Sequence, residues 1–383
     1  MYLSMVQQRS RLLASGLSVF LLVAAGAGCS TNNASNSNGS SGVSCAPPPS
    51  TLPGFPVPQG PPVITGGFAY AVKTFSHKVV WYKVENSGAL ASSGEICAGF
   101  QPTFIAAHPT RKLVYVTNYN SGTVSAYTID AASGALTPVP GSPFPAGNGP
   151  GAIAVNPSRD VVYVTNFDSD TISVYEIETT GALKLVQTLA TGGGPDAIAI
   201  NSARTLAYVV NFRADRVSAY KIDTTGRLEA GVSTTTVPAR GPNAITISPT
   251  DSSLIYVTNE ETHNVSAYRI VDAATGQLAS LSGSPFATGL GPEGVVVDPT
   301  GKFVYVSDGQ ADTISIYTIG AGGMLQTPRS PISTLPARDP EGIVMDSVTN
   351  TIYVVNRESD DVSAYKISNS TTGALSLVGQ FGL

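Results

Sequence analysis

The sequence predicts an all-β fold, a seven-bladed β-propeller of four-stranded antiparallel blades, from three observations. A Tyr in a "YVTN"-like segment and a Tyr in an "SAY"-like segment stand twelve residues apart in each of seven copies. Successive copies are 45 to 49 residues apart, a period that in a chain of strands and turns indicates propeller blades. A Gly precedes the last expected strand of every copy. The paired tyrosines are Tyr70 and Tyr82, Tyr115 and Tyr127, Tyr163 and Tyr175, Tyr208 and Tyr220, Tyr256 and Tyr268, Tyr305 and Tyr317, and Tyr353 and Tyr365.

The third copy illustrates the four strands expected in a blade. Segments "GAIAV" from Gly151, "VVYVTN" from Val161, "TISVYEI" from Thr171 and "ALKLVQTL" from Ala182 are rich in the β-branched and aromatic residues that strands favour. The second segment is apolar on both faces, as expected where blades pack face to face. We expect the Gly before each fourth strand to adopt a positive φ in a hairpin, and the Asn or Asp after each second strand to bond the backbone of the following loop.

The N-terminal 60 residues differ from the repeats and divide into two segments. Residues 1–28 resemble a lipoprotein signal peptide: Arg9 and Arg11 precede an apolar run, and small residues precede Cys29, the expected lipidation site. Cleavage after Ala27, which would release a soluble protein, is the alternative. Residues 29–60 are rich in Ser, Asn and Pro and are expected to form a tether. The propeller then spans residues 61–383.

Two further cysteines, Cys45 and Cys97, lie in the tether and the first repeat. In the oxidising compartment that an export signal implies, a disulfide between them would fasten the tether to the propeller. Two unrelated thiols are the alternative.

Composition and motifs exclude several functions. The net charge of −5 and the pI near 5.2 argue against nucleic-acid binding. We expect no cofactor, since phosphate-binding and metalloprotease motifs are missing. We also expect no metal: "NFDSD", residues 166–170, begins like a calcium loop but lacks the later Gly and Glu, and is interpreted as a polar hairpin loop. The three histidines, His77, His108 and His263, are expected to be solvated loop residues.

On these anchored copies, residues 61–383 resemble the YVTN repeat of surface-layer proteins and the lactonase-type seven-bladed propellers, a family that includes 6-phosphogluconolactonases. The resemblance implies that loops entering the first strand and loops joining the second and third strands share one face, which carries the ligand site at the channel mouth. In such relatives the entering loop often reads Pro-Arg-His. Here the residues at the His position are Ala152, Ala197, Ala244, Gly294 and Gly342.

On that face, the residues directly after the Pro of each entering loop form the first candidate site. Asp196, Asn243, Glu293 and Glu341 make a partial polar ring, and Arg240 and Arg338 precede two of the prolines. Paired carboxylates can provide acid–base catalysis, an Arg can stabilise an oxyanion, and the same set can bind a polyol or a cation. The alternative is that these side chains only cap exposed turns.

The loops after the second strands form the second candidate site. Their first residue is aromatic in three copies and charged or small in the next three. Exposed aromatic rings beside polar groups suit sugar or peptide recognition, unless the rings fold over their own hairpins. The residues are Tyr119, Phe167 and Phe212, then Glu260, Gly309 and Arg357.

Two functions follow from these sites. In the first, the chain is an exported, lipid-anchored monomer whose propeller face binds a cell-wall, glycan or protein ligand. In the second, it is a lactone hydrolase, with Glu293 or Glu341 as base and Arg240 or Arg338 stabilising the oxyanion. An exported enzyme would not act on 6-phosphogluconolactone, because sugar phosphates of central metabolism are cytoplasmic.

Overall fold

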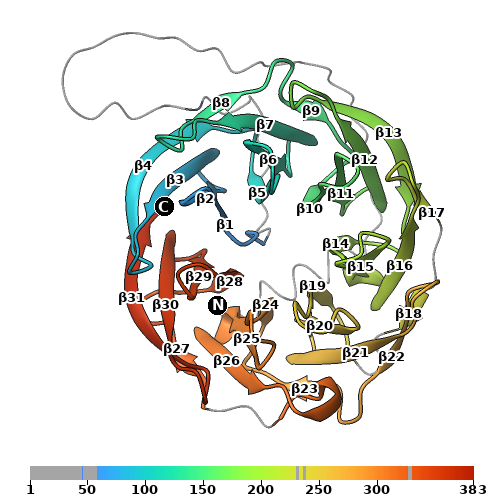
Figure 1. Cartoon of the computed structure of the whole chain (residues 1–383), viewed down its shortest axis with the longest axis vertical. Coiled ribbons are helices and arrows are strands. Elements are labelled where there is room, and N and C mark those ends of the chain that lie inside the picture. The colour runs from blue at the N-terminus through green and yellow to red at the C-terminus, as the bar shows by residue number, and fades with distance from the viewer. Residues whose placement is uncertain (1–44, 46–57, 230–232, 236–238, 327–329) are drawn as a thin grey trace, which may run out of the picture. The chain divides into compact units, whose positions relative to one another are not determined.

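The computed structural model describes residue 45 and residues 58–229, 233–235, 239–326 and 330–383. Within this part of the chain, seven antiparallel sheets follow one another in sequence order, and Figure 1 shows them arranged around an axis with the first strand of each sheet innermost. The seven-bladed propeller is therefore confirmed. The signal peptide, Cys29 and residues 30–44 and 46–57 of the tether lie outside the described residues. No helix in the described ranges is long and apolar enough to cross a bilayer.

Each of blades 1 to 4 is a contiguous stretch of chain. Blade 1 has β1 (Val63–Thr65), β2 (Phe68–Lys73), β3 (Lys78–Val84) and β4 (Leu90–Cys97). Blade 2 has β5 (Pro102–Ala107), β6 (Leu113–Asn118), β7 (Thr123–Ile129), β8 (Leu136–Pro138) and β9 (Phe144–Pro145). Blade 3 has β10 (Pro150–Asn156), β11 (Val161–Asn166), β12 (Thr171–Ile177) and β13 (Leu183–Ala190). Blade 4 has β14 (Pro195–Ile200), β15 (Leu206–Asn211), η1 (Phe212–Ala214), β16 (Arg216–Ile222), β17 (Leu228–Glu229) and β18 (Ser233–Thr235).

Blades 5 to 7 repeat the pattern. Where a sheet has a fifth short strand, this strand pairs with the third strand and so continues the outer edge. Blade 5 has β19 (Pro242–Ile247), β20 (Leu254–Asn259), β21 (Asn264–Asp272), β22 (Gln277–Ser280) and β23 (Phe286–Ala287). Blade 6 has β24 (Pro292–Val297), β25 (Phe303–Asp308), η2 (Gly309–Ala311), β26 (Thr313–Thr318), η3 (Ala321–Gly323) and β27 (Ile332–Ser333). Blade 7 has β28 (Pro340–Asp346), β29 (Thr351–Asn356), β30 (Asp361–Asn369) and β31 (Ala374–Gly382).

The repeated residues build the contacts between blades. Every residue of the second strand is buried in blades 2 to 7, as expected for strands packed on both faces. In six blades the first-anchor Tyr donates its hydroxyl hydrogen bond to the carbonyl of the hairpin Gly in the next blade, as from Tyr115 to Gly181 at 3.1 Å. The exception is Tyr208, whose buried hydroxyl has no hydrogen-bond partner among the described residues. Gly181 has φ +91°, and a Cβ there would lie 2.5 Å from Leu113, so the position requires glycine. All seven hairpin glycines have positive φ, which confirms the prediction.

The Asn that ends the second strand has different main partners from the one predicted. Instead of bonding chiefly the following loop, Asn118 donates to Ser125 of the third strand at 3.0 Å and accepts from the backbone N–H of Gly99 at 2.9 Å. The Ser of each "SAY" segment takes this role in six blades. The pairs are Asn118–Ser125, Asn166–Ser173, Asn211–Ser218, Asn259–Ser266, Asp308–Ser315 and Asn356–Ser363.

The ring closes without exchange of strands between the ends of the chain. β1 to β4 form one sheet and β28 to β31 form another. One apolar cluster joins the two sheets and includes Tyr82 and Leu90 of blade 1 with Tyr353 and Val362 of blade 7. The hydroxyl of Tyr353 donates to Gly88 O at 2.9 Å, which is the same inter-blade bond as elsewhere in the ring. Side-chain packing therefore closes the propeller.

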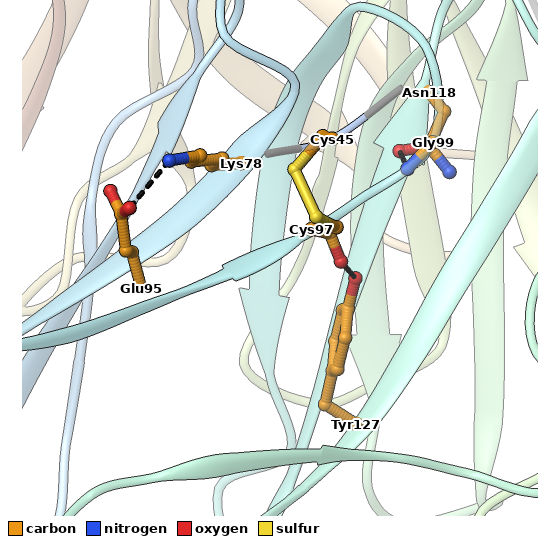
Figure 2. Close-up of a disulfide and its surroundings, with 7 residues drawn as sticks. All are labelled: Cys45, Lys78, Glu95, Cys97, Gly99, Asn118 and Tyr127. Carbon is orange, nitrogen blue, oxygen red and sulfur yellow. Dashed lines mark hydrogen bonds and ion pairs between the residues drawn. A yellow bond between two sulfur atoms is a disulfide. The ribbon is translucent and has the colours of Figure 1, made fainter. Parts of the chain in front are cut away.

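A disulfide joins Cys45 to Cys97, with the Cα atoms 5.6 Å apart, which confirms the predicted pairing. Figure 2 shows that the carbonyl of Cys97 also accepts a hydrogen bond from the hydroxyl of Tyr127, at 2.9 Å. Cys97 thus ends β4 at a point where blade 1 meets blade 2. The covalent link ties residue 45 to the frame of the propeller.

Candidate functional site

The first strands lie innermost in the ring (Figure 1), and the residues at their starts form the channel mouth. In blades 2 to 7 each of these strands begins at a Pro, and the next residue occupies the mouth position. Pairing of Val63 with Tyr70 and of Ala106 with Tyr115 places Gly60 at this position in blade 1. The seven mouth residues in ring order are Gly60, Thr103, Gly151, Asp196, Asn243, Glu293 and Glu341. Charge is therefore confined to blades 4, 6 and 7.

Glu341 is the most enclosed carboxylate of the mouth, with 2% of its surface exposed. Its Oε1 atom is 3.1 Å from Nε of Arg357, and its Oε2 atom accepts a hydrogen bond from the backbone N–H of Gln59 at 2.5 Å. The other first strands have Pro, which lacks an N–H, at the position of Gln59. Blade 1 can therefore donate a backbone hydrogen bond to Glu341, which a proline at this position could not do.

Arg357 is the cation that the structure places beside Glu341. Its Nε donates to Oδ2 of Asp339 at 2.8 Å, and its Nη2 donates to the same oxygen at 2.5 Å. Burial opposes the charge on Arg357, but the carboxylates of Glu341, Asp339 and Glu293 outweigh burial and raise its pKa. Burial raises the pKa of Asp339, and Arg357 acts against that rise. The cluster holds three carboxylates around one guanidinium.

Glu293 is half-buried and is the carboxylate of the cluster that reaches solvent. Its Oε2 atom accepts a hydrogen bond from Nδ2 of Asn243 at 3.0 Å, and Asn243 in turn accepts from the hydroxyl of Thr258 at 2.8 Å. Asn243 also donates to the carbonyl of Pro292 at 2.9 Å. The Asn243 side chain thus links blade 5 to blade 6 and orients Glu293. Asp196, the remaining acid of the ring, is buried in blade 4.

Arg240 and Arg338 occupy different surroundings from those predicted. Arg240 is exposed and lies 3.8 Å from Asp215 and 3.5 Å from Glu261. Arg338 is also exposed, and its backbone N–H donates to Ser359 Oγ at 3.1 Å. Each stands directly before the positive-φ residue of an entering turn, and both are exposed, whereas Glu341 is buried. Arg357, predicted as a ligand-binding residue, takes the place beside Glu341 expected of Arg240 or Arg338.

Asp339 was not among the predicted site residues, although the sequence holds a signal for it. Its φ is +57°, and blades 3 to 6 have Gly149, Gly194, Gly241 and Gly291 at the same turn position. Blade 2 has Gln101 there, also with a positive φ, and Asp is one of the residues that adopt this conformation most readily. The carboxylate of Asp339 pairs with Arg357, while its backbone N–H donates to Oδ1 of Asp312 at 2.8 Å, as the N–H of Gly194 donates to Asp170.

The aromatic loop residues do not form one exposed surface. Phe212 is 7% exposed, so for this residue the alternative of a covered ring holds and not that of an exposed one. Phe167 is half-buried; its ring centroid is 6.2 Å from that of Phe212, and the guanidinium of Arg213 lies 4.6 Å above it. Tyr119 instead lines a hollow between blades 2 and 3. Phe167 and Phe212 therefore pack against each other, while Tyr119 lines the hollow.

The histidines have structural partners. His108 is 1% exposed and its Nε2 lies 3.1 Å from Oδ1 of Asp160, so the prediction of a solvated residue is wrong for it. His77 and His263 are partly buried and accept hydrogen bonds from the backbone N–H groups of Gln101 and Gly291, at 3.2 and 3.1 Å. In other blades the equivalent backbone hydrogen bond is accepted by the carboxylate of Asp170 or Asp215. His77 and His263 therefore take the place of an Asp.

A family model described as "Lactonase, 7-bladed beta-propeller" matches residues 65–381. The chain belongs to this family. The mouth cluster of Glu293, Glu341 and Arg357 therefore lies on a lactonase-type propeller. The His that the entering loops of such propellers often carry is missing from this chain. No sequence among the curated proteins matches the chain significantly.

Solved structures show the same fold. A protein from Lactobacillus plantarum is 22% identical, with a TM-score of 0.71 over 82% of this chain and 95% of that one. The periplasmic gluconolactonase PpgL of Pseudomonas aeruginosa is 16% identical, with a TM-score of 0.70 over 80% and 92%. Virginiamycin B lyase from Staphylococcus aureus is 15% identical, with a TM-score of 0.57 over 78% and 92%. Two different activities among these neighbours mean that the fold alone does not define the reaction.

Proposed function

We propose that this lactonase-family propeller hydrolyses an uncharged lactone at the channel mouth. The observation that carries the proposal is the convergence of Glu293, Glu341 and Asp339 on the guanidinium of Arg357. Family membership and the gluconolactonase activity named for the Pseudomonas neighbour support the same reaction class. The reading as a binding module has less support, because the mouth carries the acid, base and cation that ring opening requires.

Glu293 is the general base of the proposed mechanism, because it is the half-buried carboxylate of the cluster and Asn243 orients it. It removes a proton from a water molecule as the water oxygen attacks the lactone carbonyl carbon. Arg357 stabilises the resulting oxyanion, because it is the cation of the cluster and the surrounding carboxylates keep it charged. The carbonyl then re-forms, the ring C–O bond breaks, and the leaving oxygen takes the proton from Glu293.

The charge of the cluster favours a neutral substrate. Three carboxylates against one guanidinium leave a formal excess of two negative charges when all are ionised. A phosphate would be repelled by this excess, whereas the hydroxyl groups of a sugar lactone can donate to carboxylates. We therefore propose glucono-1,5-lactone, rather than its 6-phosphate, as the type of substrate.

Hydrolysis of glucono-1,5-lactone by the purified propeller, followed by proton release, tests the proposal. Glu293→Gln should lower kcat by about 10²–10⁴-fold, because the amide cannot accept the proton. Glu261→Gln, a change on the neighbouring loop that pairs with exposed Arg240, should leave kcat within about twofold. Failure of the wild-type protein to accelerate hydrolysis, or full activity in the Glu293 variant, would contradict the assignment.

We also propose that the enzyme works outside the cytoplasm, anchored through a lipid on Cys29. The disulfide between Cys45 and Cys97 supports an oxidising compartment, since cytosolic thiols remain reduced. Labelling with a radioactive fatty acid should mark the wild-type chain and place it in the membrane fraction. Cys29→Ala should lose both signals, and a chain that stays labelled would refute the anchor.

A further inference from the structure

A hollow between blades 2 and 3 lies outside the proposed catalytic cluster. Its volume is about 270 Å³, and it is lined by Tyr119, Asn120 and Ser121 of one loop, by Asn148 and Gly149 before β10, and by Asp168 of the next loop. The catalytic cluster belongs to blades 6 and 7, on a different side of the ring (Figure 1). The hollow is therefore a separate feature of the same face.

The walls of the hollow are fixed by backbone bonds and by a glycine. The carbonyl of Gly149 accepts from Phe167 N at 2.8 Å, and that of Asn148 accepts from Asp168 N at 3.2 Å. A Cβ on Gly149, whose φ is +62°, would lie 2.6 Å from Oδ2 of Asp168 and 3.0 Å from Cζ of Tyr119. Because Gly149 has no side chain, the carboxylate of Asp168 and the ring of Tyr119 can both lie against its backbone.

The loop that carries Asp168 is held in place by contacts with blade 4. Arg213 donates to the carbonyl of Phe167, pairs with Asp170 at 3.2 Å and covers the Phe167 ring. Asp170 also accepts from Gly194 N at 2.7 Å. These contacts hold the loop in one position, so the polar groups of the hollow are preorganised for a ligand.

The chemistry of the lining fits a saccharide. Two amides, a hydroxyl and one carboxylate provide donors and acceptors for sugar hydroxyls, and a tyrosine ring can pack against the C–H face of a pyranose. The lining contains no Lys or Arg, which disfavours an anionic ligand. The volume falls just below the range of about 300–1,000 Å³ that holds drug-sized ligands, so it suits a single sugar ring.

We propose that this hollow is a saccharide-binding site, distinct from the lactone site, that takes one ring of a neutral glycan. Tyr119 provides the stacking surface, while Asp168 and Asn148 bind hydroxyl groups. The site would hold the enzyme on a polysaccharide through a surface that takes no part in the reaction. It does not depend on the proposed lactone hydrolysis.

Calorimetric titration of the purified propeller with neutral β-1,4-linked tetramers of glucose and of N-acetylglucosamine tests the site. At least one tetramer should bind with a Kd on the order of 1 mM or tighter. Tyr119→Ala and Asp168→Asn should each weaken that binding at least about tenfold, the change that 1.4 kcal/mol produces. Asp168 is exposed, so its variant should fold even if the Tyr119 variant does not.

Phe75→Ala is the matched control, because Phe75 is a 61% exposed aromatic residue in the corresponding loop of blade 1. It should bind like wild type, and all three variants should keep any lactone hydrolysis. Absence of binding by both tetramers at 10 mM, a probe concentration set at about ten times the expected Kd, would overturn the proposal. Unchanged binding by Asp168→Asn, or binding of tri-alanine in place of the sugars, would also overturn it.

Discussion

Blades 2 and 3 and blades 6 and 7 share one frame and differ at three matched positions. At the channel mouth the first pair has small or neutral residues and the second pair has two glutamates. At the end of the second strand the first pair has two Asn, and blade 6 has an Asp. At the next loop position the first pair is aromatic, and blade 7 has an Arg. The matched sets are Thr103, Gly151, Asn118, Asn166, Tyr119 and Phe167, against Glu293, Glu341, Asp308, Asn356, Gly309 and Arg357.

This difference shows that the residues that stabilise the repeats and the residues of the candidate site are separate sets. The inter-blade bond from Tyr115 to Gly181 recurs from Tyr305 to Gly373 at 3.0 Å, so both sides are held by the same contacts. At these matched positions, charged residues occur only in blades 6 and 7, where the buried ones require partners because burial penalises charge. Replacing residues on the two sides should therefore have unequal effects at equivalent positions.

The largest effect is expected for Arg357→Leu. This change leaves Asp339 and Glu341 buried without their cation, which should cost about 3–5 kcal/mol of unfolding free energy and abolish lactone hydrolysis. Phe167→Leu, at the same repeat position in blade 3, keeps an apolar side chain and should cost below about 1.5 kcal/mol. Urea unfolding of both variants measures the contrast.

A compensated variant distinguishes lost charge pairing from lost packing. Combining Arg357→Leu with Asp339→Asn and Glu341→Gln removes the unpaired charges and should recover most of the stability without recovering activity. If the triple variant is as unstable as the single one, burial of unpaired carboxylates is not the cause.

The frame could be predicted from the sequence because each of its contacts recurs. The hairpin Gly at 181 and its equivalents mark a positive φ, and the paired Tyr residues mark strands that face a neighbour on both sides. The mouth position after each Pro was also predictable from its register. A residue that recurs at the same repeat position indicates that the same structural environment recurs. Seven copies together therefore identify strands and turns that a single copy would leave ambiguous.

The site was only partly predictable, because partners across blades are not encoded by any period. Glu341 was found by its position, but its cation is Arg357 from the second-strand loop and not Arg338, which lies three residues before it. Arg338 is exposed, whereas the next residue, Asp339, has a left-handed backbone, is buried and pairs with Arg357. The burial of Phe212 likewise depends on residues of other loops, because its ring lies against Phe167 of blade 3 and beside Gly241, which precedes β19.

A smaller effect, of opposite sign, is expected for Asp308→Asn. Asp308 is fully buried, and burial raises its pKa to about 6 even though Ser315 and Thr313 donate hydrogen bonds that lower it. The unfolded value is near 3.9, so the folded state binds the proton more tightly. The stability that this proton contributes is complete below about pH 4 and is lost as the pH rises through about 6.

Asp308→Asn should consequently raise the unfolding free energy by roughly 2–3 kcal/mol at pH 8 and change it little at pH 4, since two pKa units correspond to about 2.7 kcal/mol. The Asn side chain fits, because five other blades place Asn in the same contact with Ser. Asn166→Asp in blade 3 is the mirror control and should lower stability at pH 8 but not at pH 4. Urea unfolding of the three proteins at both pH values measures these differences. If wild type and Asp308→Asn were equally stable at pH 8, burial of the carboxylate would have no energetic cost. An ionised side chain would then be tolerated at this position as well as an amide side chain.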